Sequence, residues 1–236
     1  MKNPLKFLNF PALVFTAAMG LVQSAHAVLP IQHWQQPGGA RVYLVESHNI
    51  PMVDVQIDLD AGSRRDPVDK PGLASAAAGQ LDSGTRAQPG AQGPYAKAMN
   101  ENQLGEAWAD LGASFAASAT GDRLSFSLRS LSDAELLDKA VQLAARQMAH
   151  PAYPQTVWLR DRDKMAAALR ESLTRPGNVA QERFAQAVYG GHPYGWRTTP
   201  ESLQRIGVAD MQRWHAQALR PCRAVVSVVG DVDRQQ

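Results

Sequence analysis

Gly72–Thr85 has the sequence GLASAAAGQLDSGT, an alanine-rich segment framed by glycines. Pro71-Gly72 predicts the start of a helix, and the alanines that follow are strong helix formers. From Gly72 to Leu81 no side chain is a histidine, a cysteine or a carboxylate. The segment therefore predicts a helix that packs well but carries no group able to bind a metal strongly or to transfer a proton.

The composition is that of an ordinary globular protein. The 236 residues are enough for one large domain or two small ones, and the 44% hydrophobic content is enough for a buried core. The formal net charge of +2 comes from Lys2 and Lys6, and the rest of the chain has equal numbers of basic and acidic residues. Since non-specific nucleic-acid binding needs a basic face, we expect no nucleic-acid partner.

The N-terminus has the pattern of a secretory signal peptide. Lys2 and Lys6 precede the apolar run PALVFTAAMGLV, and Ala25-His26-Ala27 matches a small-x-small cleavage site. The apolar run spans only about 18 Å as a helix, which is short of the roughly 30 Å core of a bilayer. We therefore expect residues 1–27 to be removed after Ala27, leaving a periplasmic or secreted protein with no membrane attachment.

Alternating strand and helix patterns indicate an α+β fold. Apolar residues alternate with polar ones in 52–62, and 113–121 with 123–131 reads as a hairpin. Further strands are expected at 41–46 and 223–231, and helices at 100–111, from 132, at 154–174, 179–189 and 208–219. We predict a layered domain with a mainly antiparallel sheet covered by helices.

Two local details can also be predicted. Ser132 and Glu135 form a capping-box pattern at the start of a helix. The apolar stripe expected on this helix is Leu136, Leu137, Ala140, Val141 and Ala144. The single cysteine, Cys222, excludes an internal disulfide and is expected to be buried, the commoner outcome for an isolated cysteine.

No active site is visible from residue types and spacing alone. The histidines beyond the expected signal peptide are His33, His48, His150, His192 and His215. None pairs with a carboxylate in an HExxH or HxxEH frame, and no G-x-S-x-G elbow, phosphate loop or dinucleotide fingerprint occurs. Residue types and spacing thus indicate an exported α+β domain without an evident catalytic centre.

Five landmarks, taken in order, resemble the pitrilysin/insulinase family of zinc peptidases, the inverzincins. They are AGSRRDP (61–67), GLASAAAGQLDSGT (72–85), HPYG (192–195), TPESL (199–203) and VVGDVD (228–233). Each landmark is weak by itself, but together they cover nearly all of the chain beyond residue 27. The resemblance implies the metallopeptidase half-domain fold.

In active members of that family the framed helix reads G-L-A-H-x-x-E-H. Two histidines four residues apart share one helix face and bind zinc, and the glutamate between them acts as general base. The corresponding positions in this chain are Ser75, Gly79 and Ala78. A further glutamate ligand of the family falls at about Ala168, with a supporting acidic position at Asp161.

The resemblance therefore implies a subunit that is inactive by itself. A structural zinc site with a full ligand set gains roughly 10–16 kcal/mol, and the single carboxylate of Asp161 or Glu171 supplies little of this. We expect no catalytic residue, no bound metal and no cofactor in this chain. Zinc is expected only in a partner subunit.

Inactive members commonly pair with an active subunit around a peptide-holding chamber. We therefore expect a heterodimer with an HxxEH-containing subunit, and a peptide substrate. In active members the strand resembling 113–121 pairs with substrate backbone by strand addition. The resemblance assigns substrate binding to an edge strand containing Phe115, Ala116, Ala117 and Ser118, for which an ordinary internal strand is the alternative.

The sequence predicts the domain organisation and leaves two alternative functions to consider. We expect a signal peptide at 1–27 and a pitrilysin/insulinase-like N-terminal domain at 28–236, with the family's second domain absent. One alternative function is a stand-alone peptide-binding or scaffold protein that reuses the fold. The other is an active metallopeptidase with relocated ligands, for which His48 or His192 are candidates.

Overall fold

The computed structural model describes residues 30–90 and 92–235. From Ile31 onward the chain is one compact unit. The expected signal peptide and its cleavage site after Ala27 lie outside the described residues. Within the described residues, no helix is both long enough and apolar enough to cross a membrane.

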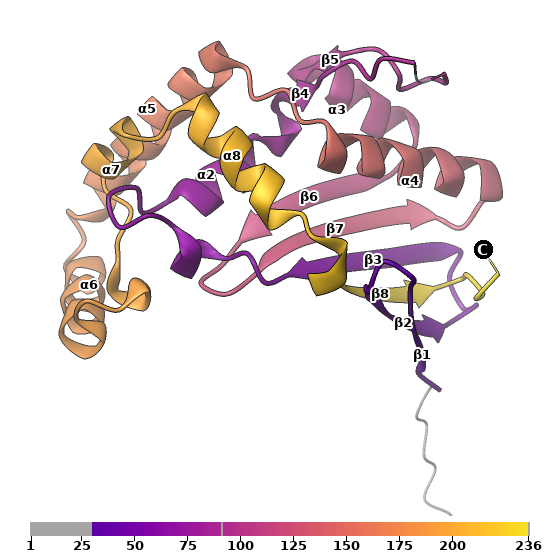
Figure 1. Cartoon of the computed structure of the whole chain (residues 1–236), viewed down its shortest axis with the longest axis horizontal. Helices are drawn as coiled ribbons and strands as arrows, with labels where there is room; N and C mark the ends of the chain where they lie inside the picture. Colours follow the sequence, from indigo (N-terminus) through magenta and orange to yellow (C-terminus); the bar gives the residue numbers. More distant parts are fainter. Residues whose placement is uncertain (1–29, 91, 236) are drawn as a thin grey trace, which may run out of the picture. The chain divides into compact units, whose positions relative to one another are not determined.

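A six-stranded sheet forms the base of the domain (Figure 1). Its strands are β1 (Gln32–Gln35), β2 (Arg41–Glu46), β3 (Met52–Leu59), β6 (Ser114–Ala119), β7 (Leu124–Leu131) and β8 (Val225–Gly230), arranged β1-β2-β8-β3-β7-β6. The pair β2–β8 is parallel and all other neighbours are antiparallel. The mainly antiparallel sheet confirms the fold class predicted from the sequence. A separate two-stranded ribbon joins β4 (Gly84–Thr85) to β5 (Met99–Asn100).

The helices gather on one side of this sheet (Figure 1). They are α2 (Leu73–Gly79), α3 (Glu101–Asp110), α4 (Ala134–Ala149), α5 (Gln155–Ser172), α6 (Pro176–Tyr189), α7 (Pro200–Gln204) and α8 (Val208–Ala218), with short 3-10 turns η2 (Ser63–Arg65), η3 (Gln80–Ser83), η4 (Pro193–Gly195) and η5 (Pro221–Arg223). In β7, Leu124, Phe126 and Leu128 are buried. The alternate residues Ser127 and Arg129 are exposed on the other face of the sheet, as the two-residue period of a strand requires.

α2 lies at the centre of the main hydrophobic core. Its alanines share that core with Phe126 of the sheet, Trp158 of α5 and Met211 of α8. Burying these apolar surfaces supplies the main stabilisation of the domain. α2 therefore has a structural role that does not depend on any chemistry.

A buried carboxylate fixes the start of α2. Asp66 is 5% exposed and accepts hydrogen bonds from the backbone N–H groups of Gly72 (2.8 Å) and Ala74 (2.9 Å). Gly72 has φ 100°, and a Cβ there would lie 2.6 Å from the Thr198 side chain. Only glycine tolerates this backbone conformation and this close approach together.

Three sequence-based expectations are wrong. Asp133, not Ser132, caps α4 by accepting from the backbone N–H groups of Glu135 and Leu136, and the Ser132 hydroxyl donates instead to Asp231 (2.6 Å). Val141 is 46% exposed because it lies beside, not on, the buried stripe of α4. Cys222 is exposed because it lies in the η5 turn between α8 and β8.

Candidate functional site

The exposed face of α2 is small and uncharged. Leu73, Ala74 and Ala76 to Ala78 are buried, whereas Ser75 and Gly79 are exposed. Residues four apart lie on the same side of a helix. Ser75 and Gly79 therefore share the one solvent-facing side of α2, where the family resemblance places two histidines.

The residues on this face do not fit a zinc ion. Gly79 has no side chain, and a Cβ built there would meet nothing within 4 Å, so the space in front of it is open. Ser75 offers only a neutral hydroxyl, and Ala78 is 3% exposed within the core. Across residues 30–90 and 92–235, no three histidine, cysteine, aspartate or glutamate side chains are grouped so that they could hold a metal.

The supporting acidic position, Asp161, is engaged in structural contacts. The buried Gln80 donates from Nε2 to Asp161 Oδ2 (2.8 Å) and links the end of α2 to α5. Arg160 also donates to Asp161 (2.7 Å) and forms two hydrogen bonds of 3.0 Å with Glu101 of α3. The guanidinium of Arg160, and after it Gln80, lowers the pKa of Asp161, so this carboxylate is ionised and already paired.

Two further positions from the sequence analysis lie along α5. Ala168 is exposed two turns after Asp161, and its methyl group can ligate nothing. Glu171 forms an ion pair with Arg175 (2.9 Å) in which both side chains are about 70% exposed. Glu171 is thus part of a surface pair at the end of α5. Asp82, close to Glu101 and Asp161, is the remaining carboxylate of the region, and burial raises its pKa.

β6 is the last strand on its side of the sheet. Within the described residues it pairs only with β7, so its other edge has unpaired backbone groups. Phe115 and Ala117 pack on the core, whereas Ala116 and Ser118 are exposed on the open face of the sheet. α2 and β6 are in contact, so the edge strand lies next to the helix that carries Ser75 and Gly79.

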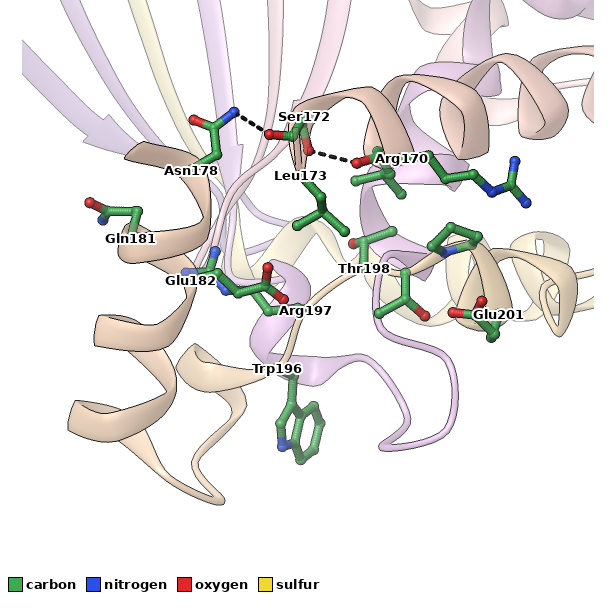
Figure 2. Close-up of a pocket in the computed structure, with 13 residues that line it drawn as sticks. Arg170, Ser172, Leu173, Asn178, Gln181, Glu182, Trp196, Arg197, Thr198 and Glu201 are labelled. Carbon is green, nitrogen blue, oxygen red and sulfur yellow. Dashed lines mark hydrogen bonds between the residues drawn. The ribbon is translucent and has the colours of Figure 1, made fainter. Parts of the chain in front are cut away.

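A pocket that sequence reasoning missed lies at the far end of α5. It has a volume of about 610 Å³ and lies between the last turn of α5, the first turns of α6 and residues 196–201 (Figure 2). Asn178 Nδ2 donates to the backbone oxygen of Ser172 (3.0 Å) and holds α6 against α5. The pocket was missed because three distant segments form it. The only sequence signal was the TPESL landmark, which contributes Thr199 to Glu201.

The charged side chains of this pocket are largely unpaired. Arg170, Glu182 and Arg197 line it without a hydrogen bond or ion pair to any described residue. Glu201 differs, because its own backbone N–H, the Thr199 hydroxyl and, after them, the charge of Arg170 lower the pKa of its carboxyl group. The two arginines of the pocket are thus matched by two carboxylates. Leu173, 49% exposed, and Trp196 supply apolar surface beside these charges.

Comparisons with known proteins agree on one class. No protein-family model matches the chain. It is 30% identical to the zinc protease PqqE of Helicobacter pylori over 105 residues, which cover 42% of this chain and 23% of that protein. Among solved structures, a peptidase M16 inactive domain from Pseudomonas fluorescens is 28% identical, with TM-score 0.80, covering 88% of this chain and 48% of the other. The periplasmic protease PqqL of Escherichia coli shares the fold at 15% identity, with TM-score 0.71, covering 88% of this chain and 22% of the other.

The fold and the degenerate α2 face define a peptidase-type half domain without a catalytic motif. In sequence and in fold the chain is similar to M16 (pitrilysin-type) peptidase domains, one of them an inactive domain. This confirms the resemblance found in the sequence. The chain spans about half or less of the length of the proteins it matches.

Proposed function

We propose that this protein is a non-catalytic, chamber-forming subunit, or part of one, of an exported zinc-dependent peptidase complex. The observation that carries the proposal is the exposed face of α2. Ser75 and Gly79 occupy it with no ligand group, while the rest of the helix is buried in the core. A helix retained for packing but lacking ligands fits an accessory subunit whose zinc is in an HxxEH-containing partner.

β6 provides the proposed contact with the peptide substrate. Its free edge has backbone N–H and C=O groups that an extended peptide can pair with by strand addition. The Phe115–Ser118 segment would thereby align the substrate beside α2. Strand addition uses backbone groups only, so it needs none of the lost catalytic side chains.

Export to the periplasm is part of the same proposal. The N-terminal segment has the charge, apolar run and cleavage pattern of a signal peptide. The structural relative PqqL is a periplasmic protease. Both features support a role outside the cytoplasm.

Peptide hydrolysis in a mixture with a candidate HxxEH subunit tests the proposal. The chain alone, the HxxEH subunit alone and the mixture are incubated with a mixed peptide library, and zinc is measured in each by elemental analysis. We expect hydrolysis to be fastest in the mixture, with zinc only in the HxxEH subunit. Hydrolysis and stoichiometric zinc in the chain alone would contradict the proposal and favour an active peptidase with relocated ligands.

Two proline variants test the role of the β6 edge. In an antiparallel pair, adjacent residues direct their N–H groups alternately to the partner strand and away from it. Of Ala116→Pro and Ala117→Pro, one therefore removes a free-edge N–H and the other a bond to β7, and thermal unfolding tells them apart. The stable variant should lose most of the stimulation seen in the mixture. Full stimulation by that variant would exclude strand addition at this edge.

A further inference from the structure

A second hollow lies between the η2 and η5 turns and shares no residue with the pocket at the end of α5. It has a volume of about 400 Å³. Arg65, Arg220 and Arg223 contribute to its wall, and among the described residues that line it Asp60 is the only carboxylate. The hollow is therefore more positively charged than the chain as a whole, in which basic and acidic residues are equal in number beyond residue 27.

Asp60 does not neutralise all of these arginines. The guanidinium groups of Arg65 and Arg64 already donate to its carboxylate and lower its pKa, so Asp60 is ionised and paired. Asp122 is a further carboxylate at this corner of the molecule, and it pairs with Arg64 (3.0 Å). Together with the two arginines of the η5 segment, four arginines meet two carboxylates, which leaves an excess of two positive charges.

The η5 turn places Arg220 and Arg223 at the same edge of the hollow. The backbone N–H of Arg223 donates to the backbone oxygen of Arg220 (3.0 Å). A turn closed by this bond brings the Cα atoms of its first and fourth residues within about 7 Å of each other. The turn is also held in place from below, because a Cβ on Gly39 would lie only 3.0 Å from the backbone of Cys222.

Both of these arginines have donors free for a ligand. Arg220 donates through Nε to the backbone oxygen of Gln217 in the last turn of α8 (3.2 Å), so its two terminal amino groups have no partner among the described residues. Arg223 forms no side-chain hydrogen bond or ion pair with a described residue. Two neighbouring guanidinium groups with free donors are well suited to the several oxygens of a phosphate group.

We propose that this hollow binds a doubly charged oxyanion, the phosphate group of a small soluble molecule. The excess of two positive charges matches a phosphate group, which carries about −1.5 to −2 at neutral pH, whereas a single carboxylate would leave part of the excess uncompensated. The hollow is larger than a bare phosphate ion, so an attached organic group fits against Trp214 in its wall. Because no residue of α2 or β6 lines the hollow, this site is independent of the proposed accessory role.

Isothermal titration calorimetry of the full chain at constant ionic strength tests the site. The probes are inorganic phosphate, sulfate, glycerol 3-phosphate and acetate, at about pH 8 where phosphate is mainly a dianion. We expect saturable binding of the three dianions and about fivefold weaker binding of acetate, as the loss of one exposed ion pair allows. Flotation with vesicles that contain phosphatidic acid examines the other source of a phosphate group. Arg223-dependent binding to these vesicles would overturn the assignment to a soluble molecule.

Variants of opposite expected sign make the test specific. Arg220→Gln and Arg223→Gln should each weaken phosphate binding about fivefold, whereas Asp60→Asn should strengthen it about threefold. Arg183→Gln is the matched control, because Arg183 is an exposed arginine of α6 that does not line the hollow. Thermal unfolding verifies that each variant is folded. Absence of saturable phosphate binding, equal affinity for phosphate and acetate, or equal effects of Arg223→Gln and Arg183→Gln would overturn the inference.

Discussion

α2 and α6 border the two candidate regions of the molecule, and they differ in almost every physical property. α2 has seven residues, of which five are buried. α6 has 14 residues, of which only Ala185 is buried, and it exposes Phe184 (64%) and Val188 (56%). The domain depends on α2 for packing, while α6 contributes little to the core and lines the pocket.

The difference shows which parts of a degenerate enzyme fold are constrained. A core position tolerates few side chains, because the interior is close-packed and even one added or removed methylene disturbs the neighbouring side chains. A position on the surface can change its chemistry freely, as Ser75 and Gly79 illustrate. The absence of ligand side chains at Ser75 and Gly79 therefore leaves the packing of α2 unaffected.

The largest expected effect is the creation of a metal site on the α2 face. Ser75→His with Gly79→His places two imidazoles four residues apart in open space, and we expect zinc binding in the micromolar range, worth about 8 kcal/mol. Zinc per chain after dialysis, measured by elemental analysis, is the readout. Ser75→His with Gly79→Ala is the control. Equal zinc in both variants would mean that the two positions do not share a face.

A matched pair of substitutions tests the packing contrast between the helices. Ala77→Leu inserts three carbons into a site that is 0% exposed, and we expect it to lower the free energy of unfolding by about 1–3 kcal/mol. Ala187→Leu makes the same change on the exposed surface of α6 and should stay within about 0.5 kcal/mol. Urea unfolding measures both. Similar losses from the two substitutions would show that α6 is packed as tightly as α2.

Asp66 makes the start of α2 sensitive to pH. Burial raises the pKa of its carboxyl group from 3.8 to about 6, against the opposing effect of the Ala74 and Gly72 N–H groups. A raised pKa means that the folded state binds the proton more tightly, so the contribution of Asp66 is largest below pH 4 and decreases up to pH 6. Relative to Asp66→Asn, the wild-type protein should lose about 2 kcal/mol over this range, measured by urea unfolding at each pH. A constant difference between the two proteins would contradict the assignment.

The smallest effect is expected at the end of α2. Gly79 has φ −67° and ψ −20°, and a Cβ there meets nothing within 4 Å. Gly79→Ala should therefore stabilise the protein by about 0.5–1 kcal/mol. Gly72→Ala, at φ 100° against Thr198, should destabilise it. Thermal unfolding of both variants checks the opposite signs.

The elements predicted best from the sequence are those with a strict period. Along β7 buried residues alternate with more exposed ones, and α2 has Leu73 and four alanines on its buried side. β1, with the sequence QHWQ, was missed because its polar residues show no apolar alternation. The α4 cap was misplaced because Ser132 and Asp133 are both good capping residues, and the competing bond to Asp231 is not visible in the sequence.

The site was predictable in its α2 and β6 parts, but not in the pocket at the end of α5. Ser75, Ala78 and Gly79 lie in one short motif, so a single framed segment identified them. Arg170 lies in α5, Glu182 in α6 and Arg197 in the loop before α7, and no spacing connects them before the chain is folded. The prediction that Cys222 is buried was wrong for a similar reason. Whether a turn is exposed depends on what packs around it in the folded chain.

The central place of β8 affects when the domain is able to fold. β8 inserts between β2 and β3 and pairs with both, although these strands precede it by most of the chain. Until residue 230 has left the ribosome, β2 and β3 lack their shared neighbour and the sheet stays in two parts. Long-range pairing of this kind slows folding. Under the export proposed above, this delay would keep the sheet open while the chain is still being made.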